Sequence, residues 1–349
     1  MSALQHIGVV GGGAWGTALA CLGRRAGRRV SLWSRDASVA SAVARDRANP
    51  VYLPGLPLDD GIESVRALEE LDACDILLLV CPAQAVRDLA PRLPGRSPVV
   101  ICAKGIEASS GLLMPELLGE LLPGRPLAVL SGPSFAEEVV RGLPTAVSIA
   151  TREAAAGEAL AAALAAGTFR PYWTHDVMGV ALGGAVKNVL AIAAGIVEGR
   201  GLGYNAAAAL VTRGFAEMAR LGRALGVELE TLTGLSGMGD LVLTCHGPLS
   251  RNRSLGLALG KGVSLAQYMT GRRQVVEGEA TAPAVLARAE RLAIEMPICA
   301  SVDAILHRGA DLDDTIRALL ARPLKHEGTR PGGSRPSGSR PSGSRHGAG

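Results

Sequence analysis

The segment "IGVVGGGAWGTALA" at residues 7–20 restricts the fold most, because an apolar β-like run meets spaced glycines and then a helical pattern. The spacing G-x-G-x-x-G falls on Gly11, Gly13 and Gly16. In such a segment the first glycine makes a tight turn, the second lets the backbone approach a pyrophosphate, and the third lets helix and strand pack closely. The N-terminus of the helix then faces the phosphate charge. The segment therefore predicts a strand, a turn and a helix that bind a dinucleotide.

The remainder of the first half alternates short apolar β-like runs with helical segments. The runs cover residues 6–10, 28–33, 75–80, 98–103, 127–131 and 146–150. This alternation predicts an α/β fold with a Rossmann-type, doubly wound parallel sheet and helices on both faces. Glycine-rich turns also occur without nucleotides, and it is the continuing pattern that favours the dinucleotide interpretation.

From about Asp176 the β-like runs stop, and Ala/Leu-rich segments predict a mostly α-helical second half. These segments cover residues 176–198, 205–225, 253–269, 280–293 and 301–320. Because 349 residues exceed the usual size of one core, we expect more than one domain. The expected division is an NAD(P)-binding domain over 1–175, a helical substrate domain over 176–326 and a disordered Ser/Arg/Pro/Gly tail over 327–349. Abundant Gly and Ala indicate closely packed helices.

Charge and cysteine usage argue against several classes of protein. The formal net charge is +4, but the last 21 residues hold four arginines and no acid, so the remainder of the chain is balanced. A balanced body without a basic stripe argues against nucleic-acid binding. The six cysteines include no C-x-x-C pair, and the N-terminus lacks the features of a signal peptide. We therefore expect a cytoplasmic protein.

Residues 178–197 reach transmembrane length and carry a single charge, Lys187. A lysine at mid-span costs about 2.5–3.5 kcal/mol on insertion scales, and Ala and Gly offset little of it. We therefore expect a buried core helix and no transmembrane segment. A buried ammonium must be paired or change its pKa, which would make Lys187 a working group. A lysine on a long helix also commonly extends to solvent, so both interpretations stay open here.

The segment "LWSRD" at residues 32–36 lies about 20 residues after the glycine-rich turn, where the adenosine ribose is usually recognised. An acidic side chain there bonds the 2′-hydroxyl of NAD, whereas an arginine accepts the 2′-phosphate of NADP. Arg35 takes this position and Asp36 follows immediately. The pattern favours NADP and leaves NAD open.

Longer motifs follow one another along the chain. They are "GGGAWGTALA", "NPVYLPG" (49–55), "AKGIE" (103–107), "SGPSFAEEV" (131–139), "GGAVKNVLAIAAG" (183–195), "GMGDLVLTCHGPLSRN" (237–252) and "VVEGE" (275–279). Together they closely resemble the bacterial NAD(P)-dependent glycerol-3-phosphate dehydrogenases, from about residue 5 to 325. The resemblance implies reversible hydride transfer between NAD(P)H and dihydroxyacetone phosphate, giving sn-glycerol 3-phosphate for glycerophospholipid synthesis. It also implies a homodimer.

The resemblance also implies roles for individual residues, with Lys187 as the residue that transfers the proton. The implied substrate contacts are Lys104, Gly132, Ser134, Lys187, Asp240, Ser250, Arg251 and Asn252. The implied cofactor contacts are Gly11, Gly13, Ala14, Trp15, Gly16, Arg35, Lys104, Ala136, Arg251, Val275 and Glu277. Arginine suits phosphate because its planar fork donates two charge-assisted hydrogen bonds, and the neighbouring Arg253 could share this task.

Several of these residues also have plainer interpretations. Asp240 could pair with a lysine and hold it in place, or cap a helix. Lys104 could be an exposed loop lysine, and Trp15 could serve ordinary packing. His175 and His246 border the expected site without an assigned role, and no histidine spacing predicts a metal.

Two other functions stay open. A related dehydrogenase acting on a hydroxy or keto acid would need an anion clamp for a carboxylate. An NAD(P)-sensing module would need the glycine-rich turn but not Lys104, Lys187 and Asp240 together.

Overall fold

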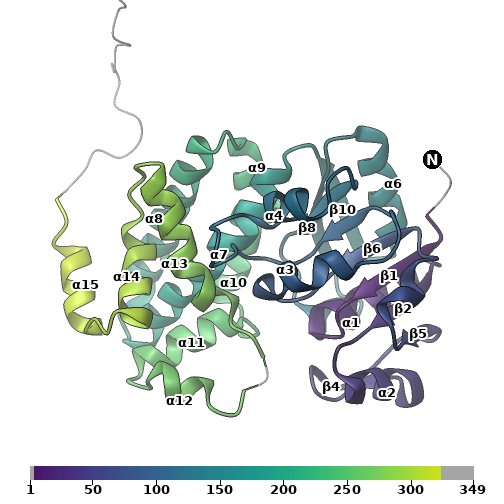
Figure 1. Ribbon diagram of the computed structural model, residues 1–349. Coiled ribbons are helices and arrows are strands. Elements are labelled where there is room, and N and C mark those ends of the chain that lie inside the picture. The colour runs from purple at the N-terminus through teal and green to yellow at the C-terminus, as the bar shows by residue number, and fades with distance from the viewer. Residues whose placement is uncertain (1–3, 273, 324–349) are drawn as a thin grey trace, which may run out of the picture.

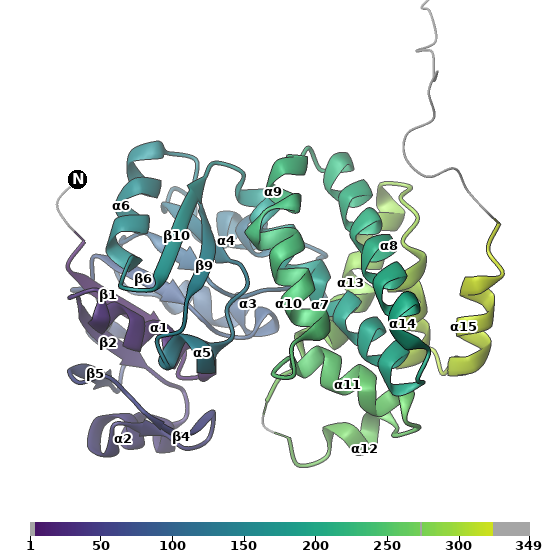
Figure 2. The ribbon, with the colours of Figure 1, turned by 180° about the vertical axis from the view of Figure 1, so that it is seen from behind.

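The computed structural model describes residues 4–272 and 274–323. An eight-stranded sheet in the order β10-β9-β8-β7-β6-β1-β2-β5 forms the first half, and the helical second half lies beside it (Figures 1 and 2). The strands are β1 (His6–Val10), β2 (Arg29–Trp33), β5 (Ile62–Val65), β6 (Ile76–Leu79), β7 (Val99–Ile101), β8 (Leu127–Ser131), β9 (Thr145–Ala150) and β10 (Phe169–Thr174). A separate two-stranded sheet pairs β3 (Ala48–Asn49) with β4 (Leu53–Pro57).

The prediction of a parallel sheet is confirmed for every neighbouring pair of the large sheet except β8 and β9, which are antiparallel. The link between those two strands contains the five-residue helix α5 (Ala136–Val140). Such a helix spans only about 7.5 Å, whereas a five-residue strand spans about 16 Å. The chain therefore turns back beside β8. No apolar run predicts β5 or β10, because both are partly exposed edge strands.

The sheet is buried on both faces. In β6, Leu77 and Leu79 belong to one hydrophobic cluster, and Ile76 and Leu78 belong to another. The second cluster includes α1 (Ala14–Arg25), whereas the first continues from the sheet into the helical half through the long helix α7 (Val177–Gly199). One face of the sheet therefore shares a continuous core with the helical half, and the other face has a core of its own.

Helix α7 is the central element of the second half. Its residues from Gly179 to Val197 are all buried, and it packs against helices α8 (Gly203–Ala224), α10 (Asp240–His246), α11 (Arg251–Gly260) and α13 (Glu277–Arg291). The helix is long and apolar enough to cross a membrane by length and composition, yet protein encloses it. The prediction of a buried core helix is confirmed.

The prediction of a mostly helical second half is confirmed, and two of the predicted segments each cover parts of two helices. Residues 253–269 cover most of α11 and all of α12 (Leu265–Met269), and residues 301–320 cover part of α14 (Pro297–His307) and all of α15 (Leu312–Leu320). Gly262 and Gly309 separate them, with φ of +88° and +64°. Glycine adopts this left-handed conformation without steric cost, which ends each helix. The other α-helices of the described residues are α2 (Ala37–Asp46), α3 (Val86–Leu89), α4 (Met114–Leu121), α6 (Ala154–Leu164) and α9 (Leu229–Thr233).

Helices α7 and α11 meet backbone to backbone. A Cβ on Gly195 would lie 2.1 Å from the carbonyl oxygen of Arg253, and one on Gly256 would lie 1.9 Å from that of Ile192. No side chain separates the two helices at these points, which confirms the predicted close packing. The contact fixes where the N-terminus of α11 stands relative to α7. The predicted tail over 327–349 lies outside the described residues.

Candidate active site

The glycine-rich turn joins β1 to α1 at the carboxyl end of the sheet. Gly11 has a φ of +129°, and a Cβ there would lie 2.6 Å from the carbonyl oxygen of Val80. A Cβ on Gly16 would lie 1.8 Å from the carbonyl oxygen of Gly11, so this glycine allows the helix to pack on the turn. A Cβ on Gly13 would meet no atom within 4 Å. The turn therefore leaves open space over Gly13, at the N-terminus of α1, where an anion is favourably bound.

The segment "NPVYLPG" braces this turn. The buried Asn49 amide donates hydrogen bonds to the carbonyl oxygen of Gly12 at 2.9 Å and to Oγ1 of Thr17 at 2.8 Å. Asn49 Oδ1 in turn accepts the backbone N–H of Tyr52 at 3.2 Å. Tyr52 lines the cavity described next. This residue lies within the motif "NPVYLPG", but the sequence alone did not identify it as a site residue.

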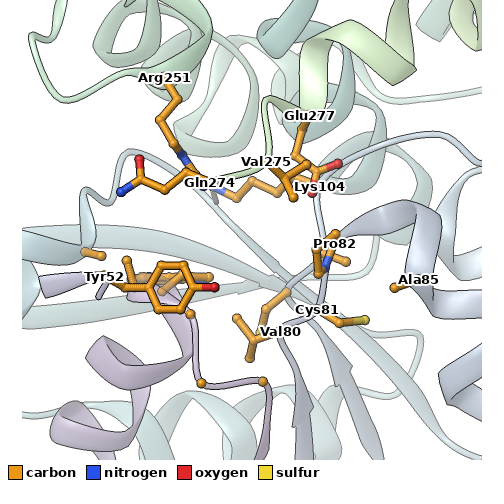
Figure 3. Close-up of a pocket in the computed structure, with 18 of the residues that line it drawn as sticks. Tyr52, Val80, Cys81, Pro82, Ala85, Lys104, Arg251, Gln274, Val275 and Glu277 are labelled. Atoms are coloured by element: carbon orange, nitrogen blue, oxygen red, sulfur yellow. The ribbon is translucent and has the colours of Figure 1, made fainter. Parts of the chain in front are cut away.

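A cavity of about 1270 Å³ runs from the glycine-rich turn to the helical half. Figure 3 shows Arg251 and Glu277 reaching toward it from the helices, with Tyr52 and Val80 on the side of the sheet. The predicted site residues that line it are Gly11, Gly13, Ala14, Trp15, Arg35, Lys104, Ser134, Ala136, Lys187, Ser250, Arg251, Asn252, Val275 and Glu277. The predicted residues Gly16, Gly132 and Asp240 lie behind this lining.

Asp240 stands between the two lysines of the cavity and is 1% exposed. Its Oδ2 accepts a hydrogen bond from Lys104 Nζ at 2.8 Å, and its Oδ1 accepts one from Lys187 Nζ. Lys187 Nζ also donates to Thr244 Oγ1 at 2.9 Å, and that hydroxyl donates to the carbonyl oxygen of Asp240 at 2.6 Å. Lys187 is 6% exposed, so it does not extend to solvent. The carboxylate therefore holds both ammonium groups and does not itself face the cavity.

For Lys187 and Asp240, burial and the opposite charge nearby shift the pKa in opposite directions. Burial lowers the pKa of Lys187 to about 8, although the Asp240 carboxylate pulls it upward. Burial opposes ionisation of Asp240, yet the two lysines outweigh this effect and hold its pKa below the usual range. Burial therefore favours the neutral form of Lys187, and the nearby carboxylate favours the charged form. Lys187 can thus exist with and without its proton near neutral pH.

A turn of π-helix, Leu235–Gly239, delivers Asp240 to this position. A Cβ on Gly237 would lie 1.9 Å from the carbonyl oxygen of Leu232, and one on Gly183 of α7 would lie 2.5 Å from that of Ser236. Glycine is thus required at position 237 for the fold of the turn itself and at position 183 for the contact of α7 with the turn. Single π-turns are frequent at functional sites, and here one sets the start of α10 against α7.

The segment "LSRN" forms the N-terminus of α11. The Ser250 hydroxyl caps the helix by accepting the backbone N–H of Arg253 at 3.2 Å. The Arg251 side chain is exposed in the cavity and forms no hydrogen bond or ion pair with another described residue. Arg253 instead pairs with Glu198 at 2.6 Å and does not line the cavity. Arg251, and not Arg253, is therefore available to an anion at this helix end.

Two asparagine amides connect the parts of the site. Asn188 donates to the carbonyl oxygen of Lys104 at 3.3 Å, and its Oδ1 accepts from Asn252 Nδ2 at 3.0 Å. Asn252 Oδ1 accepts the backbone N–H of Gly278 at 2.9 Å. These bonds join the loop after β7, α7, α11 and the start of α13. Asn252 is predicted as a substrate contact. In the structure its amide oxygen already accepts a hydrogen bond from the protein backbone.

Glu277, the first residue of α13, places a carboxylate in the cavity. Its Oε1 accepts the backbone N–H of Ala83 at 3.3 Å, and its buried Oε2 has no hydrogen-bond partner among the described residues. Burial raises the pKa of Glu277 to about 7, while the Ala83 N–H and the charge of Arg251 act against this. An unsatisfied buried polar atom in a cavity indicates a place where a ligand can bond.

The remaining predicted residues take varied positions. The Trp15 indole Nε1 is buried without a hydrogen-bond partner among the described residues, although its ring lines the cavity. The carbonyl oxygen of Gly132 accepts from Lys104 Nζ at 3.2 Å and from the Ser134 hydroxyl at 2.9 Å. His175 pairs with Glu228 at 2.9 Å, and a ring nitrogen of His246 lies 3.0 Å from the carbonyl oxygen of Val242. Neither histidine lines the cavity.

The sheet, the open glycine-rich turn and the paired lysines on one cavity define a dinucleotide-dependent oxidoreductase. Two family models match the chain, described as the N-terminus and the C-terminus of NAD-dependent glycerol-3-phosphate dehydrogenase, over residues 6–157 and 176–317. The chain belongs to the NAD-dependent glycerol-3-phosphate dehydrogenase family.

Individual relatives agree with this assignment. A glycerol-3-phosphate dehydrogenase (NAD(P)+) of Rhodospirillum rubrum is 56% identical over 330 residues, which cover 93% of this chain and 95% of the relative. One from Caulobacter vibrioides is 52% identical, with 93% and 99% covered. The crystal structure of glycerol-3-phosphate dehydrogenase from Coxiella burnetii superimposes with a TM-score of 0.86 at 40% identity, covering 91% of this chain and 99% of that one.

Proposed function

We propose that the protein interconverts dihydroxyacetone phosphate and sn-glycerol 3-phosphate with NADPH or NADH. The observation that carries this proposal is that Lys187, paired with Asp240, and the free Arg251 at the N-terminus of α11 open on the cavity of the glycine-rich turn. One end of this cavity suits the phosphates of a dinucleotide, and the other offers a proton donor beside an anion site.

The substrate phosphate binds at the N-terminus of α11. Backbone N–H groups in the first turn of a helix lack partners within it, and the helix dipole favours negative charge there. The Arg251 guanidinium adds two parallel charge-assisted hydrogen bonds. A substrate that lacks the phosphate forfeits these interactions, so the phosphate end orients the carbonyl group toward the lysines.

Lys187 supplies the proton in the reduction. The nicotinamide of the bound cofactor supplies the hydride, which leaves negative charge on the carbonyl oxygen of the substrate. Lys187, with its pKa lowered to about 8 by burial, gives a proton to that oxygen in reduction and removes one in oxidation. Lys104 stabilises the developing negative charge beside it. Asp240 keeps both ammonium groups aimed at this point, which is the lysine-pairing role considered from the sequence.

The fit of the cofactor rests on four features of this chain. Gly13 leaves room for a pyrophosphate, and the Trp15 Nε1 and Glu277 Oε2 are buried atoms without partners among the described residues. Arg35 lines the cavity beyond the end of β2. We assign Ala14, Ala136, Val275 and Arg251 to the same cofactor surface because each lines the cavity.

Three wider assignments accompany this function. We place the domain division between β10, which ends at Thr174, and α7, which begins at Val177. A role in glycerophospholipid synthesis follows from the product. A cytoplasmic location is supported by the six cysteines, all of which are free thiols. The homodimer implied by the family resemblance stays a prediction.

The decisive experiment follows oxidation of NADPH and of NADH by the purified protein with dihydroxyacetone phosphate. Unphosphorylated dihydroxyacetone and a keto acid serve as substrate controls, and Lys187→Ala serves as the inactive variant. We expect turnover only with the phosphorylated ketone. Turnover of the keto acid instead would favour the related hydroxy-acid dehydrogenases, and cofactor binding without any turnover would favour an NAD(P)-sensing module.

A further inference from the structure

The carboxyl end of β5 contributes an arginine to the cavity that no sequence motif indicates. Strands β2 and β5 are parallel, and their register pairs Trp33 with Val65 at the last residue of each strand. Ser34 and Arg66 are the next residues on these two neighbouring strands. Both line the cavity together with Arg35. The sheet thus brings two arginines and a serine to one edge, although 30 positions separate Arg35 from Arg66 along the chain.

Both guanidinium groups are available to a ligand. Arg35 and Arg66 are exposed, and neither guanidinium forms a hydrogen bond or ion pair with another described residue. The Arg66 backbone is nevertheless anchored, because its N–H donates to Glu70 Oε1 at 2.9 Å. Two cations that line one end of a cavity without protein partners attract an anion there. Such a pair at the rim of a nucleotide cavity is suited to a compact anion of high charge.

The neighbouring carboxylate has another task. Asp36 is the N-cap of α2, and its Oδ1 accepts the backbone N–H of Ser38 at 2.9 Å and the Ser38 hydroxyl at 2.6 Å. A carboxylate fixed in a helix cap is less available to bond a ribose 2′-hydroxyl, which is how an acidic residue after the second strand selects NAD. In "LWSRD", the Asp36 carboxylate is therefore held by the helix cap, whereas the Arg35 side chain is exposed in the cavity.

We propose that Arg66, with Arg35 and Ser34, forms a subsite for the 2′-phosphate of NADP and makes the protein prefer NADP to NAD. The proposal rests on the proposed function only in taking the ligand to be a nicotinamide dinucleotide. The end of β2 is where the adenosine ribose of such a ligand lies, whereas its pyrophosphate lies at the glycine-rich turn. Arg66 is thus a specificity-determining residue contributed by an edge strand.

The test measures nucleotide binding without substrate, by titrating the protein with NADPH and with NADH and following the fluorescence of the reduced nicotinamide. In Arg66→Ala we expect the Kd for NADPH to rise about 10- to 100-fold, the loss typical of a hydrogen bond to a charged group, with the Kd for NADH changed less than twofold. Calorimetric titration with 2′,5′-ADP and 5′-AMP isolates the phosphate, and only 2′,5′-ADP should lose affinity. Arg96→Ala removes an exposed arginine that does not line the cavity and should change neither Kd.

The outcomes separate this inference from the proposed function. Equal weakening of NADPH and NADH in Arg66→Ala, or no change in either, overturns the subsite. A second variant, Arg66→Gln, keeps a polar side chain and should retain the loss for NADPH if charge is the cause; unimpaired binding would refute a charge-based subsite. Selective loss for NADPH in a protein that does not reduce dihydroxyacetone phosphate would uphold the subsite and reject the proposed substrate.

Discussion

The glycine-rich turn and the lysine cluster border the same cavity but are built in opposite ways. The turn is local, because Gly11, Gly13 and Gly16 lie within six consecutive residues and their spacing sets their geometry. In the cluster, Lys104, Lys187 and Asp240 come from three distant parts of the chain and meet only in the folded protein. Local geometry can be read from spacing, whereas a distributed charge cluster depends on how elements pack. The two regions should therefore respond differently to substitution.

The largest expected effect comes from the cluster. Lys187→Ala removes the proton donor, and general acid–base catalysis contributes about 10²- to 10⁴-fold. We expect kcat to fall by about 10³-fold with the Kd for NADPH unchanged, measured by steady-state kinetics and fluorescence titration. Lys261→Ala, at an exposed position beyond α11, is the matched control. A loss of less than tenfold in Lys187→Ala would refute the proton-donor role.

Substitutions in the turn should separate binding from folding. Gly13→Ala adds a Cβ that meets no protein atom, so the melting temperature should stay the same while the Kd for NADPH rises about tenfold through obstruction of the pyrophosphate. Gly16→Ala forces a Cβ to 1.8 Å from a carbonyl oxygen, and overpacking of this kind costs about 1–3 kcal/mol of stability. Thermal unfolding and titration of both variants check this. An equal fall in melting temperature for both would contradict the difference between the two glycines.

The pH dependence of catalysis should reflect ionisation in the lysine cluster and not a property of the glycine-rich turn. Because Lys187 has a pKa of about 8, its protonated form dominates below pH 8 and its neutral form above. Reduction, which needs the proton, should slow about tenfold per pH unit well above pH 8, and oxidation should slow likewise below it. Asp240 raises the pKa of Lys187, so Asp240→Asn should move both breaks to lower pH. Profiles of kcat/KM measured in both directions test this, and a break that stays in place in Asp240→Asn would exclude Lys187 as its source.

The smallest expected effect concerns the contact between the two halves. Arg288 of α13 forms two hydrogen bonds to Glu116 of α4, at 2.6 and 2.8 Å, and it is half-buried. Ion pairs near the surface contribute about 0.2–1 kcal/mol, so Arg288→Ala should lower kcat/KM for dihydroxyacetone phosphate no more than about fivefold. The Kd for 2′,5′-ADP should not change, because the residues of that subsite come from the sheet alone. Weakened binding of 2′,5′-ADP would show that the two regions are coupled.

The same contrast explains what could be predicted from the sequence. The runs at β1, β2, β6, β7 and β8 have the apolar pattern of buried strands. The long helix that contains Lys187 is predictable because its residues are otherwise apolar over about 20 positions. The direction of β9 depends on the length of the link before it, which no residue of the strand encodes. The sequence pattern does not separate α11 from α12, because Gly262, which separates them in the structure, is one of many glycines in the chain.

The site residues divide in the same way. Thr244 and Asn188 are common, uncharged residue types, and only their contacts with Lys187 and Lys104 distinguish them. Arg66 follows a short edge strand and gains its position from the register of that strand with β2. The position of Asp240 behind the cavity lining results from a π-turn, which spacing does not reveal. Long-range packing, and not residue type, decides each of these cases.

The backbone contact between α7 and α11 has a consequence for evolution. Lys187 stands on α7, and the proposed phosphate site is the first turn of α11. Since these helices touch through glycines and carbonyl oxygens, the span from the reacting carbon to the phosphate is set by main-chain atoms. Gradual exchange of side chains cannot lengthen that span. A descendant of this enzyme that accepts a longer phosphorylated ketone would have to shift a whole helix, so the chain length of the substrate should be among its slowest properties to diverge.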